Sequence, residues 1–408
     1  MKKIVLLCTG LLATWTLCAR EVTEIEVDSR ARSYTLYFPE GRATDEPTQL
    51  VVMLHGLGQT MDEYLPAAKG QELANTYECA ILVPQAIAEQ DAEVNSVASF
   101  VGTQYPMLST SALAHVWNAG ASATTADIKA SLGTYSAIWD MMAPNICPNA
   151  YAAGKVQMQS GVDDVKFINA AIDQATDDYN LKPEIWMTGL SLGGAMCYRY
   201  AFSGQSRAAK IAVVSGFIGH EVQVPATIGL PVMVINSRTD EVVTYEGNLF
   251  ADAVETNVNR LAQAQGHGAF NEENTTRIGD EQTGTEVRDY EEHPRLLFYK
   301  VLDADHTLGN LQGYDLYDHI WTYFEETLNK VKETQATTKA LQLYPNPAGD
   351  VVYTETDGLY TISDLSGRTL LRGETDDRAI VVGSLSRGRY LVTLQTDQNC
   401  YKALLLKR

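Results

Sequence analysis

The sequence is poor in basic residues and in long apolar runs. Its 408 residues hold 31 Lys and Arg against 51 Asp and Glu, so the formal net charge is −20. That balance, without a clustered basic stripe, argues against a nucleic-acid partner. The chain also lacks an H-E-x-x-H sequence, a pair of CxxC motifs and an EF-hand loop. We therefore expect neither a catalytic metal nor a cofactor.

One apolar run, residues 4–12, stands close to the start of the chain. Two lysines precede it, and Ala19 offers a small residue for cleavage. This order is typical of a signal peptide over residues 1–19, which is too short to span a bilayer. A lipoprotein signal at Cys18 is disfavoured because the bulky Leu17 precedes that cysteine. We expect an exported protein without a transmembrane segment.

Cysteine is scarce, with six residues in the whole chain. Cleavage after residue 19 leaves Cys79, Cys147, Cys197 and Cys400. An exported compartment permits disulfides, but the spacing of the four leaves their pairing open.

Apolar runs alternate with helical patterns over most of the chain. The segments 21–27 and 33–39 alternate apolar and polar residues and predict an antiparallel hairpin. Short buried-strand patterns and amphipathic helices follow in turn, which predicts an α/β fold with a mostly parallel sheet flanked by helices. We assign this α/β domain to residues 20–333. The predicted strands are 50–56, 79–85, 185–189, 211–218, 231–237 and 295–302, and the most regular helices are 161–180 and 313–333.

Residues 86–160 interrupt this alternation. The segment is rich in Ala, Ser and Thr and carries Trp117 and Trp139. A connection of that length is rarely a bare loop, so we expect an insertion with its own helices, either a lid over the site or a structural excursion away from it.

The pattern changes after residue 333. Residues 334–340 form a polar linker, and residues 341–408 hold short alternating strands separated by Gly, Asp and Ser turns. This pattern predicts a small all-β sandwich domain at the C-terminal side.

The sequence GLSLG places Ser191 between Gly189 and Gly193, after a strand pattern and before a helical one. A sharp strand-to-helix turn of this kind exposes a serine hydroxyl, and it needs small neighbours because the backbone segments approach closely. We predict that Ser191 is a nucleophile. The N–H of Leu192, at the start of the helix, is a candidate donor to an oxyanion.

A serine nucleophile needs a base and an acid that orients the base. Asp240 follows one later strand pattern and His306 follows the last one, so we predict Asp240 as the acid and His306 as the base. Glu241 is the less favoured alternative to Asp240. Asp303 and Asp305 flank the histidine and are less favoured still as its partners.

The second oxyanion donor is expected after an early strand, where the chain reads LHGLGQT. Gly56 permits close approach of the backbone, and the N–H of Leu57 is the candidate donor. We expect His55 to shape this turn. The alternative is a tight strand-to-helix turn without a chemical role.

Several other polar residues have ordinary structural explanations. Asp163 and Asp164 stand at the start of a helical pattern and are expected to be its N-cap and first-turn acids, with capping as their main role. Cys197 is expected to be buried packing on the helix after Ser191. The remaining histidines lack a position at a strand end and are expected to be structural; they are His115, His220, His267, His293 and His319.

Over about residues 30–330 the chain resembles the secreted poly(3-hydroxybutyrate) depolymerase-like esterases, which are relatives of feruloyl and acetylxylan esterases. The segments VVMLHGLGQT, MTGLSLGGAM, NSRTDEVV and DADHTLGN carry the resemblance. By position, it implies the same nucleophile, acid and base, namely Ser191, Asp240 and His306. It also implies the α/β-hydrolase fold, an ester substrate, possibly polymeric, and no cofactor.

The C-terminal segment resembles the type IX secretion sorting domain. LYPNPAGD, LSRGRYLVTL and KALLLKR carry this likeness. It implies the type IX secretion machinery as a partner, with export across both membranes to the surface or the medium. The alternative is a polymer-binding module, but the segment has no tryptophan to stack on a polymer.

These observations favour a secreted serine esterase. A polyester, a feruloylated or acetylated polysaccharide and a short-chain ester all remain open as substrates. The alternatives are a serine peptidase with the same triad and a surface adhesin with a relic site.

Overall fold

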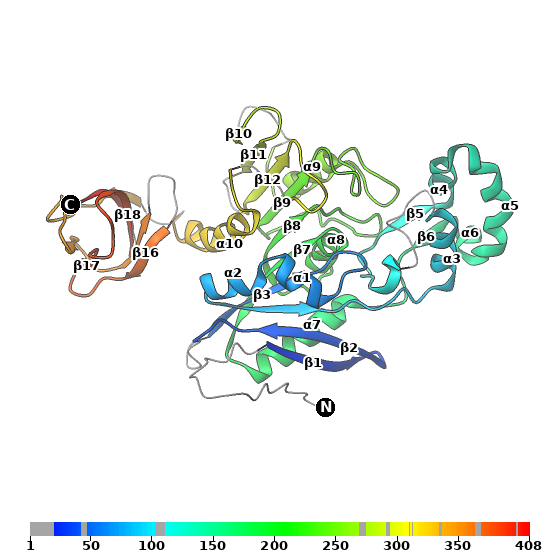
Figure 1. The fold of residues 1–408 in the computed structure, drawn as a ribbon, viewed down its shortest axis with the longest axis horizontal. Coiled ribbons are helices and arrows are strands. Elements are labelled where there is room, and N and C mark those ends of the chain that lie inside the picture. The colour runs from blue at the N-terminus through cyan, green and yellow to red at the C-terminus, as the bar shows by residue number, and fades with distance from the viewer. Residues whose placement is uncertain are drawn as a thin grey trace. The chain divides into compact units, whose positions relative to one another are not determined.

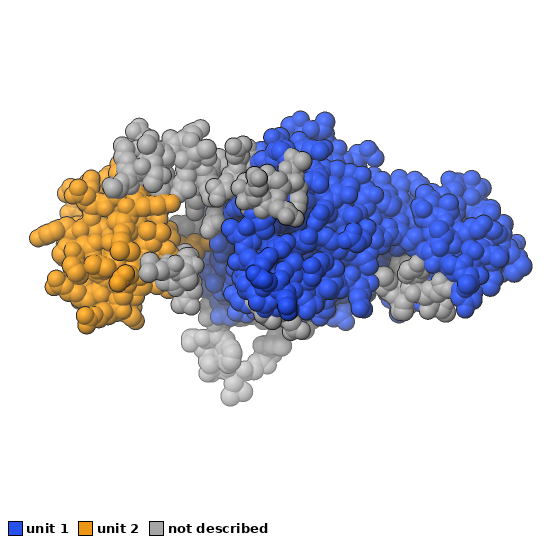
Figure 2. Space-filling model, turned by 90° about the horizontal axis from the view of Figure 1, so that it is seen from above, with its two compact units in different colours: residues 1–324 blue, residues 325–408 orange. Residues whose placement is uncertain are grey.

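The computed structural model of the chain divides into two units, Met1–Phe324 and Glu325–Arg408 (Figure 2). The predicted signal peptide lies outside the described residues, as do residues 334–336 of the predicted linker. The described residues are 20–41, 47–102, 111–268, 275–290, 294–309, 311, 313–333, 337–363, 369–396 and 399–408.

The first unit is built on one twisted sheet whose centre is parallel (Figure 1). The strand order is β1-β2-β4-β3-β7-β8-β9-β12-β11-β10. The strands from β4 to β12 in this order are parallel, and antiparallel strands close both edges. The strands are β1 (Arg20–Val27), β2 (Arg30–Tyr37), β3 (Thr48–Leu54), β4 (Cys79–Pro84), β7 (Leu181–Leu190), β8 (Ala208–Val214), β9 (Val232–Ser237), β10 (Thr275–Ile278), β11 (Thr285–Tyr290) and β12 (Leu296–Val301).

Helices cover both faces of this sheet. One buried cluster contains side chains of α7 (Asp164–Asp178), α8 (Leu192–Ala201) and α9 (Val254–Ala264). The other contains side chains of α1 (Met61–Ala67), α2 (Gly70–Thr76) and the first turns of α10 (Leu316–Glu333). No helix in the described ranges combines the length and the hydropathy that a membrane span needs.

Strand β3 shows why the central strands read as unbroken apolar runs. Leu50, Val52 and Leu54 pack into the α7–α9 cluster, while Val51 and Met53 pack into the other. Successive side chains of a strand point to opposite faces, so a sheet covered on both sides buries every position. This confirms the predicted α/β fold.

The insertion contributes its own helices, which gather beyond one end of the sheet (Figure 1). A short antiparallel pair, β5 (Ser122–Thr124) and β6 (Lys155–Gln157), brings the chain into and out of its distal part. The other elements are α3 (Ala92–Val101), α4 (Thr125–Ser131), α5 (Ser136–Ile146), α6 (Pro148–Ala153) and the 3₁₀ turns η2 (Ala112–Ala114) and η3 (Gly133–Tyr135).

The second unit contains the end of α10 and a small all-β region. Its five-stranded sheet has the order β13-β19-β18-β15-β16, and β14 pairs with β17. Buried residues from both sheets, including Val352, Ile362, Val392 and Leu405, form its separate core. The strands are β13 (Thr337–Ala340), β14 (Val351–Tyr353), β15 (Leu359–Ser363), β16 (Thr369–Glu374), β17 (Ala379–Val381), β18 (Gly388–Gln395) and β19 (Asn399–Lys407).

Candidate active site

Ser191 stands at a sharp turn between β7 and α8. Its backbone has φ 58° and ψ −121°, a conformation that non-glycine residues keep only when the surroundings enforce it. The Ser191 N–H donates to Val214 O at 2.9 Å, and the Ala195 N–H donates to Ser191 O at 2.9 Å. The turn is thus tied both to the neighbouring strand and to the helix, with the half-buried serine at the carboxyl end of β7.

The two glycines around the serine permit this turn. A Cβ on Gly189 would lie 2.5 Å from the carbonyl oxygen of Gly193. A Cβ on Gly193 would lie 2.1 Å from Leu54 O and 2.5 Å from His55 O. Neither approach leaves room for a side chain, because the obstacles are backbone atoms. The motif therefore packs the turn directly against the end of β3.

The loop after β3 lies beside the serine. A Cβ on Gly56 would be 3.5 Å from Ser191 Cβ. Within this loop, the Gly56 N–H donates to Gln59 Oε1 at 2.8 Å. Among the described residues, the N–H groups of Leu57 and Leu192 have no hydrogen-bond acceptor. Both predicted donors are thus unsatisfied groups close to Ser191, and the Leu192 N–H is at the positively polarised end of α8.

His55 braces this loop from inside the core. Its Nδ1 lies 2.8 Å from Gly56 O, and its Nε2 lies 3.1 Å from the Ala86 N–H. Because a carbonyl only accepts and a backbone N–H only donates, Nδ1 carries the proton and Nε2 accepts. Burial lowers the pKa of His55 to about 4. The ring is therefore neutral at neutral pH and holds the loop through two fixed hydrogen bonds.

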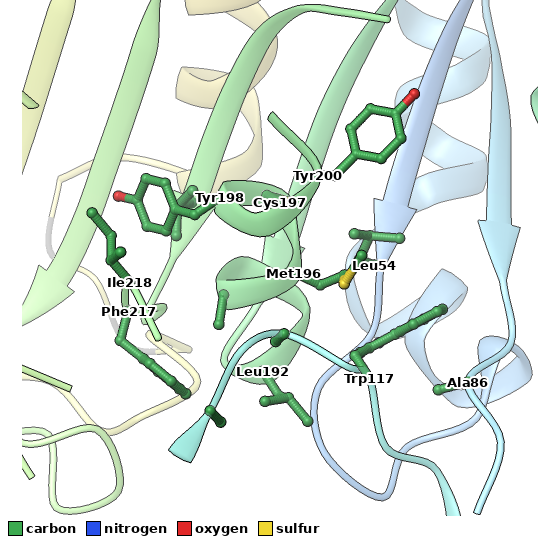
Figure 3. Packing of buried hydrophobic residues seen from close by; sticks show 14 of the residues in the cluster. Leu54, Ala86, Trp117, Leu192, Met196, Cys197, Tyr198, Tyr200, Phe217 and Ile218 are labelled. Atoms are coloured by element: carbon green, nitrogen blue, oxygen red, sulfur yellow. The ribbon is translucent and has the colours of Figure 1, made fainter. Parts of the chain in front are cut away.

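The insertion is fastened to the same loop. Trp117 Nε1 donates to His55 O at 2.9 Å, and the two rings pack with centroids 4.9 Å apart. Figure 3 shows Trp117 near Leu54 and Leu192 in one packed cluster. The Leu192 side chain is only 3% exposed. It consequently supports the core below the serine turn.

Asp240 and His306 meet across the carboxyl ends of β9 and β12. His306 Nδ1 lies 2.7 Å from Asp240 Oδ2, and the aspartate side chain is fully buried. Asp240 Oδ1 accepts the N–H groups of Val242 at 2.7 Å and Val243 at 3.0 Å. The carboxylate is therefore held on both oxygens, and it directs the Nδ1–H of the imidazole towards itself.

Two hydroxyl groups join the aspartate loop to the histidine loop. Ser237 Oγ donates to Ala304 O at 2.7 Å and accepts the Ala304 N–H at 3.2 Å. Thr239 Oγ1 makes the same two contacts, each at 3.1 Å. Both peptide groups of Ala304 are satisfied two residues before His306, so this pair fixes the course of the chain into the histidine. The sequence analysis missed it, although Ser237 directly follows a predicted buried strand.

The alternative acids have other partners or none. Glu241 is exposed. Asp303 Oδ1 lies 3.3 Å from Thr239 Oγ1, and Asp305 accepts the Thr307 N–H at 2.9 Å as a turn residue. In the part of the chain that the structure describes, Asp240 is the carboxylate that bonds to His306.

Asp163 and Asp164 differ in role. Asp163 caps α7 by accepting the Lys166 N–H at 3.0 Å, as expected. Asp164 is instead fully buried, 2.7 Å from the Arg32 guanidinium, and it also accepts the Asn118 N–H at 2.7 Å. Burial raises the pKa of Asp164. Asp164 does lie in the first turn of α7, as expected, but it does not cap the helix, because α7 packs this position against Arg32 of β2.

The cysteines whose side chains the structure describes offer no reactive thiol at the site. Burial raises the pKa of Cys197 far above its usual value, so the residue stays a protonated packing group, as predicted. Cys147 is also buried and free. Cys79 Sγ lies 3.4 Å from Trp321 Nε1, and the side chain of Cys400 lies outside the described residues.

Part of the first unit matches a known protein family. Residues 32–96, which contain the loop of His55 and Gly56, match the family model described as esterase PHB depolymerase. The protein is a carboxylic ester hydrolase. No curated protein matches the chain.

The esterase is also similar to solved structures at low identity. An acetyl xylan esterase from Aspergillus awamori is 12% identical, with a TM-score of 0.46 over 75% of this chain and 99% of that chain. An S-formylglutathione hydrolase from Staphylococcus aureus is 12% identical, with a TM-score of 0.39 over 76% and 98%. A cold-adapted esterase from an Arctic intertidal metagenomic library is 12% identical, with a TM-score of 0.39 over 75% and 93%.

The second unit contains the sorting signal of the esterase. Residues 342–407 match the secretion system C-terminal sorting domain. This match favours the sorting domain over the polymer-binding module, and it indicates export to the cell surface or the extracellular space.

Proposed function

We propose that the esterase is a serine hydrolase that cleaves carboxylic esters through a triad of Ser191, His306 and Asp240. The substrates we consider are polyesters, feruloylated or acetylated polysaccharides and short-chain esters. We assign catalysis to residues 20–333 and recognition by the type IX secretion machinery to residues 341–408. Of the predicted linker 334–340, residues 337–340 instead form strand β13 of the second unit.

In the first half-reaction, Ser191 Oγ attacks the ester carbonyl carbon while its proton passes to Nε2 of His306. The negative charge that develops on the carbonyl oxygen is stabilised by the N–H groups of Leu57 and Leu192. The bond to the alcohol then breaks, and the alcohol leaves with the proton from His306. Asp240 stays ionised and stabilises the imidazolium in between.

In the second half-reaction, a water molecule attacks the acyl-enzyme carbonyl. His306 accepts a proton from that water and returns it to Ser191 Oγ as the acid leaves. The nucleophile and the base are thus restored without a cofactor.

The contact of 2.7 Å between His306 Nδ1 and Asp240 Oδ2 carries this proposal. It orients the imidazole so that Nε2 is the nitrogen that remains for the serine proton. Two further features support the assignment. Ser191 holds a strained backbone at the carboxyl end of the same parallel sheet, and the Gly56 loop lies against it.

The test compares two serines at adjacent strand ends. Ser215 follows β8, also has positive φ (46°), and its buried hydroxyl makes no hydrogen bond within the described part. Ser191→Ala is expected to abolish hydrolysis of p-nitrophenyl acetate and labelling by a fluorophosphonate, whereas Ser215→Ala keeps both. Labelling that persists in Ser191→Ala overturns the proposal. Aminoacyl-amide turnover above ester turnover contradicts the substrate class.

A further inference from the structure

A polar cavity of about 640 Å³ opens on the α8 side of the sheet, in the first unit. Its walls come from the β1–β2 turn, the segment before β5, the loop before α7, the end of α8 and residues 221–223. Ser191, Asp240 and His306 are not among its lining residues. Arg199, which lines it, stands eight residues beyond Ser191 on α8 (199 − 191 = 8), about 12 Å along the helix axis. The cavity is therefore separate from the proposed reacting groups.

The Arg199 side chain lines this cavity with a positively charged guanidinium group. The residue is half-buried, and within the described residues it makes no ion pair and no hydrogen bond. The neighbouring carboxylates already have other cations: Glu221 pairs with Lys155 at 2.9 Å, and Asp164 pairs with Arg32. A guanidinium has five N–H donors and no acceptor, so Arg199 can bind several oxygen atoms of a ligand.

Asn118 is a buried residue of the inner wall. The residue is 3% exposed, and its Nδ2 donates to Val162 O at 2.6 Å. Its buried Oδ1 has no hydrogen-bond partner in the part of the chain that is described. This oxygen is sealed inside the protein, so the Asn118 amide forms the fixed back of the cavity, and the polar groups open to a ligand are those of Arg199 and Asp163.

The remaining walls add an acceptor and an apolar face. Asp163 uses Oδ1 to cap α7, while its other carboxylate oxygen makes no hydrogen bond within the described residues. Phe202 lines the cavity with a half-buried ring. Asp28, also in the wall, is paired with Lys166. The charges of Arg199 and Asp163 offset each other, so the cavity as a whole suits a neutral ligand.

We propose that this cavity binds neutral sugar residues. A sugar hydroxyl both donates and accepts, so one ring can accept from Arg199 and donate to Asp163. The C–H face of the ring packs against Phe202. A volume of about 640 Å³ lies within the usual range for ligand sites. An anion would instead meet the carboxylate of Asp163.

Sugar binding at this distance from Ser191 points to a polysaccharide carrying the cleaved ester. This last step rests on the proposed function, whereas binding itself needs no catalysis.

The experiment measures binding by isothermal titration to the full chain carrying Ser191→Ala. The probes are xylotriose and cellotriose, with glucuronate and glycine as charged comparisons. The neutral oligosaccharides are expected to bind at millimolar or lower concentration. Arg199→Gln is expected to weaken this binding at least about tenfold, since it removes a charge-assisted hydrogen bond. The matched control is Arg207→Gln, whose guanidinium pairs with Asp173 outside the cavity wall.

Absence of oligosaccharide binding, or equal binding by Arg199→Gln, overturns the proposal. Binding of glucuronate or glycine alone also overturns it, in favour of a charged-ligand site. Should Arg199→Gln fail to fold, Arg199→Lys keeps the charge, loses the planar fork and is expected to weaken binding to a smaller degree. p-Nitrophenyl acetate carries no sugar, so its hydrolysis by the unaltered chain tests the triad alone, whereas the binding experiment uses a chain without Ser191. Failure of the triad assignment would therefore leave the binding result valid. Failure of the binding proposal would likewise leave the triad assignment valid.

Discussion

His306 Nδ1 lies 2.7 Å from Asp240 Oδ2, although 66 residues separate them in the chain. The contact follows from the sheet, because β9 and β12 are adjacent parallel strands and each residue follows one of them. Asp240 is immobilised by two backbone N–H groups on its other oxygen. The imidazole is thus oriented by a carboxylate that has no freedom to turn.

Replacing Asp240 by Asn tests this orientation. The amide nitrogen of Asn would favour the opposite imidazole tautomer, so kcat for p-nitrophenyl acetate is expected to fall roughly 10⁴-fold. Steady-state kinetics at pH 7 to 9 provide the measurement. Glu241→Gln removes the exposed neighbouring carboxylate and is expected to retain most of the activity. A larger loss in Glu241→Gln than in Asp240→Asn would exchange their roles.

The hydroxyls of Ser237 and Thr239 share Ala304, so their removal should be coupled. Ser237→Ala alone leaves the contacts of Thr239, and we expect a loss of about 1–2 kcal/mol in the free energy of unfolding. Adding Thr239→Val frees the peptide groups of Ala304 and is expected to lower kcat about tenfold, since misplacement near the reacting groups is costly. A double-mutant cycle on kcat and on urea unfolding measures both effects. If the effects of the two substitutions on kcat and on the free energy of unfolding simply add, the two hydroxyls do not act together on Ala304.

Gly193→Ala is expected to prevent correct folding. Its Cβ would lie 2.1 Å from Leu54 O, and backbone on both sides of the contact blocks relaxation. We expect a destabilisation of more than about 4 kcal/mol, or no soluble protein. Gly229→Ala is the control, because that Cβ meets nothing within 4 Å. Thermal unfolding of the two variants decides, and similar midpoints would refute the steric argument.

His55 makes stability depend on pH. Its pKa is about 4 in the folded chain and 6.5 as the ordinary value, because burial opposes the charged ring. Below pH 6.5 His55 binds a proton in the unfolded chain, whereas in the folded chain it binds one only below about pH 4. The free energy of unfolding therefore falls by about 3 kcal/mol as pH drops through this window, and the full contribution is present above pH 6.5.

Urea unfolding at pH 7 and at pH 4.5 measures this change. His55→Gln is expected to be less stable at pH 7 but to lose less stability on acidification. An unchanged dependence on pH in the variant would assign the effect to other groups.

The α/β sheet and the order of the site residues could be predicted from sequence for one physical reason. Strands buried on both faces appear as apolar runs, and the carboxyl ends of parallel strands meet at one edge of the sheet. Ser191, Asp240 and His306 each follow such a run, so their common edge is encoded in local patterns.

Contacts between distant segments carried no comparable signal. The Arg32–Asp164 pair joins residues 132 positions apart, and both residue types are usually exposed. Asp164 also precedes a helix, where an acid is normally a cap. The hydroxyl contacts of Ser237 depend on how two loops cross, which neither periodicity nor composition describes.

The two-stranded pair of β5 and β6 has a consequence for protein engineering. Thr124 stands opposite Lys155, so the chain leaves and re-enters the body of the enzyme at neighbouring points. Residues 125–154 therefore form an excursion whose two ends are neighbours. Another helical segment with the same end-to-end spacing can be grafted there. The hydrogen bond from Trp117 to His55 lies outside the exchanged residues and is retained. Trp139 of the native segment packs against Phe100 of α3. The grafted segment therefore needs an apolar side chain that packs against the Phe100 ring.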